Sequence, residues 1–399
     1  MRRLEALDGL RGYFLVFMVL NHLVFTGGYL LVKVNHQELG FVQDAQGFVF
    51  LSGLLVGMVY AGQMKKRGYE VGAAKVRGRA RELYGWELFC LVAILGLGLL
   101  MAESSTFWEP WLWQLADNNL SFVLATATLL YQPTYMDILP QYIVYMMVAP
   151  PLVWLCVTGR WHVVAVGSFL SWMAVQFGAH LPLADAVDRG MKMIDPDLAL
   201  RAHFNVFAWQ AVFMSGLVLG ALTTTRQIDW DKVMNPRATG LLWCAVGIVV
   251  FFMAWRLGRS FDVLPQSVVE RIAATEIRGE FSLLFLLNFA GAAYLVGWLM
   301  IAGPRSEHPA TRWIGEALHW LFTLSFLRLI GRHSLHVYVF HVILIYLLKG
   351  FDHHYGAFNE ATKTLIALLA VASLALPALW REWRTNRDRT AVAGQARTA

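Results

Sequence analysis

Charged residues are scarce in this sequence. Only 15% of its 399 residues are Asp, Glu, Lys or Arg, whereas 57% are hydrophobic, and the mean hydropathy is +0.51. Soluble domains carry about a quarter charged residues, so the composition excludes a soluble globular protein and predicts a polytopic membrane protein. The net charge of +6 does not indicate binding to nucleic acid, because its distribution along the chain fits a membrane topology instead.

Cysteine is also rare, and the common cofactor motifs are missing. The three cysteines, Cys90, Cys156 and Cys244, lie in apolar runs, where we expect buried small hydrophobic residues instead of disulfides or metal ligands. The sequence has no Walker A motif, no Rossmann glycine fingerprint, no zinc-spaced His/Cys cluster and no Gly-x-Ser-x-Gly elbow. We therefore expect no metal site and no bound cofactor.

Ten apolar stretches are long enough to cross a bilayer. They are residues 11–31, 45–62, 84–102, 138–157, 162–179, 204–222, 237–256, 281–302, 334–349 and 362–380. Two further stretches compete with them. Residues 119–131 are short, and residues 313–330 carry charges that favour an interfacial amphipathic helix. We leave both out of the predicted spans.

The positive charges predict the orientation. With the N-terminus inside, most of the 33 Lys and Arg residues fall on the cytoplasmic side, including those of segment 63–83 and of the basic tail 381–399, whereas segment 103–137 has neither Lys nor Arg. The prediction is an all-α polytopic membrane protein with about ten transmembrane helices and both termini cytoplasmic. We expect residues 1–399 to form a single integral membrane domain.

Three polar residues share one face of the first apolar helix. Asp8 lies three residues before Arg11, and His22 lies eleven residues after it, which is close to three helical turns. The helical rise places His22 about 16 Å beyond Arg11, roughly half a bilayer deep. An imidazole at that depth is a candidate functional group, although a hydrogen bond between helices would also explain it.

A second polar stripe lies near the C-terminus. Ser334, Tyr338 and His341 are spaced four and three residues apart, so they share one face of an otherwise apolar helix. His341 is a second imidazole predicted inside the membrane. Each of the two histidines has a structural alternative, but the pair together favours function.

Other polar residues begin apolar helices at their predicted outer ends. They form three groups: Asp44 with Ser52, Asp137 with Gln141, and Asn205 with Trp209 and Gln210. We interpret Asn205, Trp209 and Gln210 as candidates to line an extracytoplasmic pocket for a polar, sugar-like ligand. The alternatives are helix caps, an aromatic belt and close helix packing, the last supported by the small residues Gly53 and Gly57 after Ser52.

Three blocks taken together resemble a known family. They are the Arg11–His22 pair, the block Phe48-Val-Phe-Leu-Ser-Gly53, and the block Gly331-Arg-x-Ser-x-x-x-Tyr-x-x-His341. The chain resembles the multi-span membrane acyltransferases called acyltransferase family three, and within them it is most similar to the OpgC branch. Residues 4–22, 44–60, 137–151 and 204–220 read like that branch's characteristic blocks. The likeness extends from residue 4 to about residue 350.

The resemblance implies an O-succinyltransferase of the bacterial inner membrane. Its co-substrate would be cytoplasmic succinyl-CoA, and its acceptor a hydroxyl of an osmoregulated periplasmic glucan. The expected partners are therefore succinyl-CoA, the periplasmic glucan and the lipid bilayer, and the sequence predicts no oligomeric state. Because donor and acceptor lie on opposite sides of the membrane, the acyl group has to pass through it.

The resemblance also suggests roles for individual residues. His22 is expected to act as general base, while His341 and Ser334 would orient the acyl group or stabilise the oxyanion; a covalent acyl-histidine is an open variant. Arg11, paired with Asp8, would hold an anionic part of the donor. The complete set of predicted substrate-binding residues is Asp8, Arg11, Asp44, Ser52, Asp137, Gln141, Asn205, Trp209, Gln210, Arg332 and Tyr338.

Two alternative functions stay open from the sequence. One is a transporter or flippase that uses the buried His, Asp and Arg residues to relay protons or gate a substrate. The other is a membrane acyltransferase with a different acyl donor or polysaccharide acceptor. The chain also departs from the branch pattern at Glu87, where a neutral residue or a histidine is expected.

Overall fold

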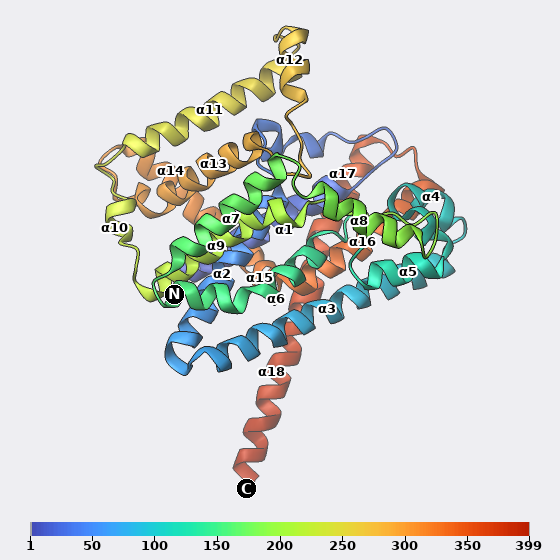
Figure 1. The fold of residues 1–399 in the computed structure, drawn as a ribbon, viewed down its shortest axis with the longest axis horizontal. Helices are drawn as coiled ribbons and strands as arrows, with labels where there is room; N and C mark the ends of the chain where they lie inside the picture. Colours follow the sequence, from blue (N-terminus) through green and yellow to red (C-terminus); the bar gives the residue numbers. More distant parts are fainter. Residues whose placement is uncertain (1, 399) are drawn as a thin grey trace. The chain divides into compact units, whose positions relative to one another are not determined.

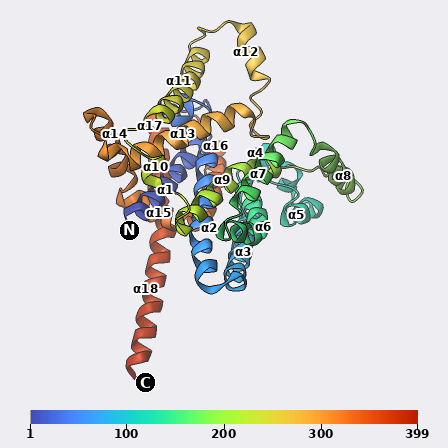
Figure 2. The same ribbon diagram turned by 60° about the vertical axis from the view of Figure 1, so that its left-hand side comes forward.

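The computed structural model describes the backbone of residues 2–398 and the side chains of residues 5–387. Over this range the chain is helical, with eighteen α-helices, four short 3-10 helices and no β-strand (Figures 1 and 2). The prediction of an all-α protein is confirmed. Contacts divide the chain into two compact units: unit 1 comprises residues 1–33 and 317–399, and unit 2 comprises residues 34–316. That the two units act as a single domain stays a prediction.

Unit 1 is a bundle of helices from the two ends of the sequence. Its helices are α1 (Arg2–His22), α15 (Ser325–Arg332), α16 (Ser334–Tyr355), α17 (Glu360–Ser373) and α18 (Ala375–Thr398). α1 and α15 are in close backbone contact because glycines face each other: a Cβ atom at Gly12 would overlap the carbonyl oxygen of Leu327, and one at Gly331 would overlap that of Asp8. Small residues allow this approach in membrane helices.

Unit 2 contains the remaining long helices. They are α2 (Asp44–Arg67), α3 (Tyr69–Leu100), α6 (Ile138–Val157), α7 (Trp161–Gln176), α9 (Val206–Thr225), α11 (Gly240–Ser260) and α13 (Leu283–Ile301), joined by shorter helices. α2 and α9 lie side by side (Figure 1). Gly53 and Gly57 pack on backbone atoms of α9, and Gly216 and Gly220 pack on backbone atoms of α2. The expected role of the small residues after Ser52 in helix packing is confirmed.

Eight helical segments are long and apolar enough to cross a membrane. They are α2, α3, α6, α9, α11, α13, α16 and the α17–α18 segment Glu360–Arg387, and a ninth arises if α7 and α8 (Leu181–Lys192), bent by 71°, count as one span. These segments are identified by length and composition alone, so the number of ten transmembrane helices stays a prediction. The first predicted span is wrong at its C-terminal end, because α1 stops at His22. The chain leaves the helix after His22, and Gly27 and Gly28 then lie in a turn of the following loop with φ of 80° and 71°, a backbone conformation that glycine adopts readily.

The basic segment 63–83 is helical, so its expected form as a loop is wrong. α2 continues to Arg67, and after Gly68 the chain enters α3, which has 32 residues. Such a helix is about 48 Å long and exceeds the roughly 30 Å hydrocarbon layer, so it has room for both a basic end and an apolar span. Residues 119–131 and 313–330 form only short helices, α5 (Leu120–Ala127) among them, which agrees with leaving them out of the spans.

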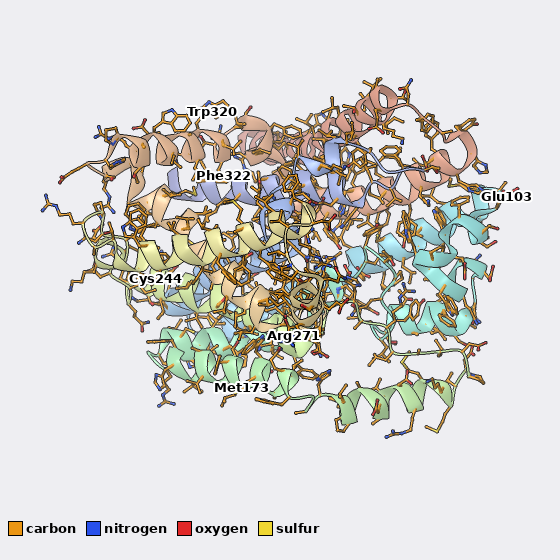
Figure 3. All side chains as sticks on the ribbon, turned by 90° about the horizontal axis from the view of Figure 1, so that it is seen from above. Glu103, Met173, Cys244, Arg271, Trp320 and Phe322 are labelled. Atoms are coloured by element: carbon orange, nitrogen blue, oxygen red, sulfur yellow. The ribbon has the colours of Figure 1, made fainter. Side chains whose placement is uncertain are left out.

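The cysteines do not all share the expected surroundings. Cys90 and Cys156 are buried, as predicted, but Cys244 is exposed on α11 (Figure 3). α11 has few buried residues along its length, and an apolar residue on such a face suits contact with lipid. The side of the membrane on which the termini lie stays a prediction.

Candidate functional site

The two predicted membrane histidines meet in unit 1. His22 ends α1 and His341 lies in the middle of α16, 319 residues later in the chain. Nδ1 of His22 is 3.2 Å from Nε2 of His341, and the two rings are stacked with their centroids 5.4 Å apart. His341 is fully buried. The fold thus brings together the two residues that the sequence singled out on separate helices.

The hydrogen bonds of the pair determine which nitrogen can act as a base. Nδ1 of His341 is 2.5 Å from the backbone oxygen of Tyr338, and a carbonyl oxygen only accepts, so this Nδ1 carries the proton. The Nε2 of a neutral His341 is then an acceptor, and Nδ1 of His22 donates to it. In a neutral His22 the lone pair therefore lies on Nε2, which is the basic nitrogen of the pair.

Ser334 and Tyr338 of the C-terminal block lie on the same helix as His341. Ser334 opens α16 and Tyr338 follows one turn later; both are buried. The Tyr338 ring packs against the imidazole of His341 with centroids 4.9 Å apart. The predicted polar stripe of α16 is therefore an inward-facing surface within unit 1, and these residues remain available as candidates to orient an acyl group.

A group of charges occupies the other end of α1. Asp8 lies within electrostatic reach of Arg11, Arg332 and His333. Arg332, which is half exposed, donates to Glu382 of α18 over 3.0 Å. This end of unit 1 is thus rich in guanidinium groups that are reachable from solvent, which suits contact with an anionic ligand.

A buried ionic clamp, which the sequence analysis missed, holds the loop after His22. The carboxylate of Asp352 accepts hydrogen bonds from the backbone N–H (3.0 Å) and the hydroxyl (2.9 Å) of Thr26. Nζ of Lys363 donates to the backbone oxygens of Thr26 (3.0 Å) and Gly28 (2.7 Å). Both charged side chains are at most 5% exposed. Each is a charged residue near the end of an apolar helix, and that position was the sequence signal that could have identified them.

In unit 2, Asp44 lies in a polar contact with a preceding 3-10 helix. Its carboxylate accepts from Nε2 of Gln37 over 2.6 Å, and Nε2 of His36 lies 3.4 Å from it. Burial lowers the pKa of His36 to about 4 despite this carboxylate, so His36 is neutral at pH 7. Asp44 is buried in this network and is not the solvated cap that the sequence left open.

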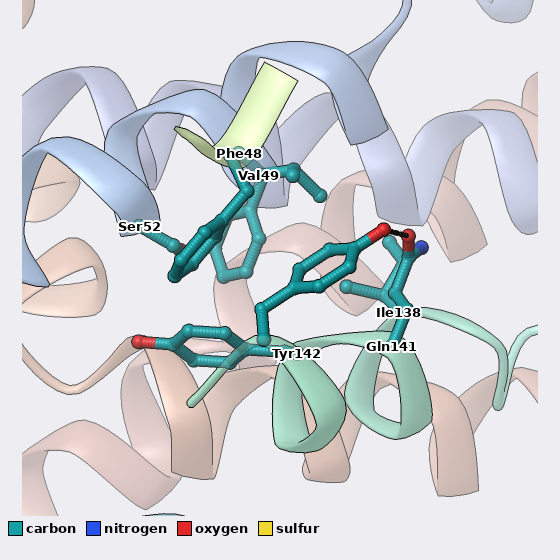
Figure 4. A pocket seen from close by; sticks show the side chains of 8 residues that line it. Phe48, Val49, Ser52, Ile138, Gln141 and Tyr142 are labelled. Atoms are coloured by element: carbon teal, nitrogen blue, oxygen red, sulfur yellow. Dashed lines mark hydrogen bonds between the residues drawn. The ribbon is translucent and has the colours of Figure 1, made fainter. Parts of the chain in front are cut away.

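Polar residues also follow one face of α6. Asp137 precedes the helix and Gln141 and Tyr145 follow at intervals of four residues; the Tyr145 hydroxyl is 3.1 Å from Oε1 of Gln141. Gln141 and Tyr145 line a small cavity between α2, α6 and α9, together with Ser52 (Figure 4). Its volume of about 10 Å³ is room for one water molecule at most. Oγ of Ser52 and Nε2 of Gln141 have no hydrogen-bond partner within the part of the chain that the structure describes.

The third predicted outer group has scaffold contacts. The side chain of Asn205 caps α9 by accepting from the N–H groups of Phe207 and Ala208. Trp209 is fully buried, and its indole N–H donates to the backbone oxygen of Arg278. Gln210 bonds to Ser168 of α7 through both ends of its amide. Their proposed contact with a ligand stays a prediction.

Two charged residues near Asp137 were not among the predicted site residues. Glu87 of α3 is 2% exposed, and neither carboxylate oxygen has a hydrogen-bond partner among residues 5–387. Its charge interacts with that of Asp137. Arg278 precedes α13. Burial raises the pKa of Asp137 to about 6, and the Arg278 guanidinium partly offsets that effect. Glu87 was visible in the sequence as a charge inside a span, whereas nothing in the local sequence distinguished Arg278.

Neither set of residues forms a metal site. Within the described part of the chain, no three His, Cys, Asp or Glu side chains lie close enough together to hold an ion. The chemistry available is that of imidazole, guanidinium, carboxyl and amide groups.

Comparison with known proteins supports the resemblance seen in the sequence blocks. The family whose description reads "OpgC protein" matches residues 2–386. No curated protein and no solved structure matches the chain. Since the match covers nearly every residue, the chain belongs to the OpgC family, and this membership implies an acyltransferase-type membrane enzyme that modifies glucans.

Proposed function

We propose that this protein is an O-succinyltransferase of the bacterial inner membrane, which moves a succinyl group from cytoplasmic succinyl-CoA to a hydroxyl of a periplasmic glucan. Family membership supports the acyl transfer and the glucan acceptor. The observation that carries the mechanism is the hydrogen-bonded pair of His22 and His341. An imidazole that is held in one orientation and one tautomer can take a proton from a hydroxyl and return it to a thiolate.

The proposed reaction starts at Nε2 of His22. This nitrogen takes the proton from the acceptor hydroxyl while the hydroxyl oxygen attacks the thioester carbonyl carbon. The tetrahedral intermediate collapses, the carbon–sulfur bond breaks, and the leaving thiolate takes the proton back from His22. The products are the glucan ester and the free thiol of coenzyme A, so no net proton is gained or lost.

His341 has a supporting role in this reaction. Its Nδ1–H is held by the Tyr338 carbonyl, so its Nε2 keeps the proton of His22 on Nδ1. When His22 becomes an imidazolium, the same hydrogen bond becomes charge-assisted and strengthens. We assign His341 to the positioning of His22, in place of the oxyanion role that the sequence suggested, and we leave Ser334 as a candidate for contact with the acyl group.

The charged end of α1 suits the donor. Coenzyme A thioesters carry phosphates, and succinate adds a carboxylate. Arg11 and Arg332 flank Asp8 and present guanidinium groups, which bind phosphate and carboxylate with two parallel hydrogen bonds. We propose that these two arginines receive the anionic donor.

Purified protein in detergent tests the proposal directly. Succinyl-CoA with a glucan oligosaccharide should release free thiol and yield an oligosaccharide heavier by one succinyl group, as measured by mass spectrometry. Acetyl-CoA serves as the competing donor, and a reaction without oligosaccharide measures hydrolysis. Preferential transfer of acetyl would replace the donor, and absence of any ester with either donor would contradict the proposed function. His22→Ala should abolish transfer, with a loss of about 10²- to 10⁴-fold.

A further inference from the structure

A cluster at one surface of unit 2 combines groups that the proposed mechanism does not use. Three segments converge there: the end of α4 (Ser104–Leu112), the loop before α6 and the loop before α9. The N–H of Thr134 donates to the backbone oxygen of Trp111 over 3.1 Å, and the N–H of Gln132 donates to that of Arg201 over 2.8 Å. Arg201 also donates to the hydroxyls of Tyr131 (2.9 Å) and Thr134 (3.2 Å). The surface is therefore held rigidly by hydrogen bonds across three segments.

The aromatic part of the cluster is held in an unusual backbone conformation. Tyr135 has φ of 71°, a left-handed conformation that bulky residues seldom adopt and that is concentrated at functional sites. Its ring packs edge-to-face against Trp111, with centroids 5.1 Å apart. Both side chains are partly exposed. They present a fixed aromatic surface two residues away from the buried carboxylate of Asp137.

The polar part of the cluster includes charged groups that interact with Tyr135. Asp137 interacts electrostatically with Tyr135, Arg278 and Glu87. Gln141 lies one helical turn farther along α6. Among the described residues, both carboxylate oxygens of Glu87 and Nε2 of Gln141 lack a hydrogen-bond partner, although each side chain is only 2% exposed. Buried polar groups normally have partners, so these unsatisfied groups independently indicate a polar ligand.

The charge balance identifies the chemistry of that ligand. Asp137 and Glu87 supply carboxyl groups, and Arg278 and Arg201 supply guanidinium groups. The carboxylates would repel an anion, and the arginines would repel a cation. The hydroxyls of a neutral ligand can donate to the carboxylates and accept from the guanidinium groups. Partly exposed Trp and Tyr rings add an apolar surface on which the C–H face of a pyranose can lie.

From this combination we infer that Trp111, Tyr135, Asp137 and Arg278, together with the buried Glu87 and Gln141, form a binding subsite for a hexose ring of the glucan acceptor. The identity of the sugar as the glucan acceptor rests on the proposed function. The geometry of the subsite does not depend on that function. Asn205 and Trp209 then have a supporting role. The Trp209 indole N–H donates to the backbone oxygen of Arg278, and the backbone N–H of Asn205 donates to that of Gly279. These bonds hold the segment that carries the Arg278 guanidinium.

The test compares Trp111→Ala and Asp137→Asn with Trp113→Ala. Trp113 is an exposed tryptophan two residues from Trp111 and serves as the matched control. Loss of one hydrogen bond to a charged group is worth about 1.5–3 kcal/mol, so Asp137→Asn should raise the KM for an unsubstituted glucan oligosaccharide at least about tenfold. Trp111→Ala should also raise it at least about tenfold, and for both variants kcat and the KM for succinyl-CoA should stay close to wild type.

Direct titration of the oligosaccharide into each protein by calorimetry separates this inference from the proposed function. If wild-type protein transfers no succinyl group, the proposed function fails, and the titration still decides the subsite: weaker binding by Trp111→Ala and Asp137→Asn than by Trp113→Ala supports it. Affinities of all three variants within about twofold of wild type, or no binding by wild-type protein, would overturn the inference. Asp137→Asn conserves shape, so it keeps the test valid if Trp111→Ala unfolds.

Discussion

Replacing His341 tests whether this residue positions the general base. His341→Ala removes the acceptor for Nδ1–H of His22 and leaves the rest of α1 unchanged. A hydrogen bond between neutral groups contributes about 1 kcal/mol, and one to a charged group about 1.5–3 kcal/mol. The difference of about 0.5–2 kcal/mol is the part of the hydrogen-bond energy that is gained only when His22 is protonated, so kcat should fall about two- to thirtyfold.

The conservative variant distinguishes this role from simple packing. In His341→Gln the side-chain amide oxygen can accept from His22, so this protein should recover most of the lost rate. His336→Ala is the matched control, because it removes a buried histidine from the same helix, and its kcat should stay within about twofold of wild type. Rates are measured as thiol release together with ester formation, and melting temperatures in detergent show whether each variant is folded.

A double substitution gives the sharpest result. If His341 acts through His22, adding His341→Ala to His22→Ala should cost almost nothing further, because residues that act as one unit are not additive. Two independent losses that multiply in the double variant would refute the positioning role. So would a His341→Gln protein as slow as His341→Ala at equal stability.

Four other outcomes follow from the same structure. Gly57→Ala should destabilise the protein by about 1–3 kcal/mol, since the methyl group overlaps a backbone carbonyl of α9, whereas Gly85→Ala, which meets no atom within 4 Å, should leave the melting temperature unchanged. Lys363→Met should lower kcat and keep the KM for succinyl-CoA, because it removes two bonds to the loop after α1; an unchanged kcat would contradict this. The free energy of unfolding should fall as the pH drops from 6.5 to about 4, because His36 is protonated in the unfolded protein over this range but stays neutral in the folded protein. His36→Gln should weaken this pH dependence of the melting temperature. Reporter fusions at Asn118 and at the C-terminus should lie on opposite sides of the membrane.

Local sequence was sufficient for those parts of the fold that depend on local forces. Apolar length gave most of the long helices, and the small residues of α2 identified a close helix contact before its partner was known. The end of α1 was missed because apolar residues continue past His22 to residue 31. Gly27 and Gly28, which lie in the loop after the helix, were visible in the sequence, but hydropathy alone takes no account of backbone conformation.

The site was predicted where a polar residue interrupted a helix and missed where it lay in a loop. His22 and His341 were anomalies in apolar runs, so each was identified separately, but their contact joins residues 319 positions apart and no periodicity encodes it. Arg278 lies among ordinary charged loop residues, and its place near Asp137 depends on tertiary contacts such as the hydrogen bond from the Trp209 indole of α9 to its backbone oxygen.

The hydrogen-bond partners of buried polar groups separate scaffold from chemistry more sharply than residue type does. Asn205 and Gln210 looked like ligand-binding residues, yet their side chains are occupied by a helix end and by Ser168. Glu87 looked like a departure from the family pattern, yet it is buried with both oxygens unsatisfied. An unpartnered carboxyl group inside a membrane protein is costly, so it persists only where something else repays that cost. A bound sugar hydroxyl next to Asp137 is a group that can do so.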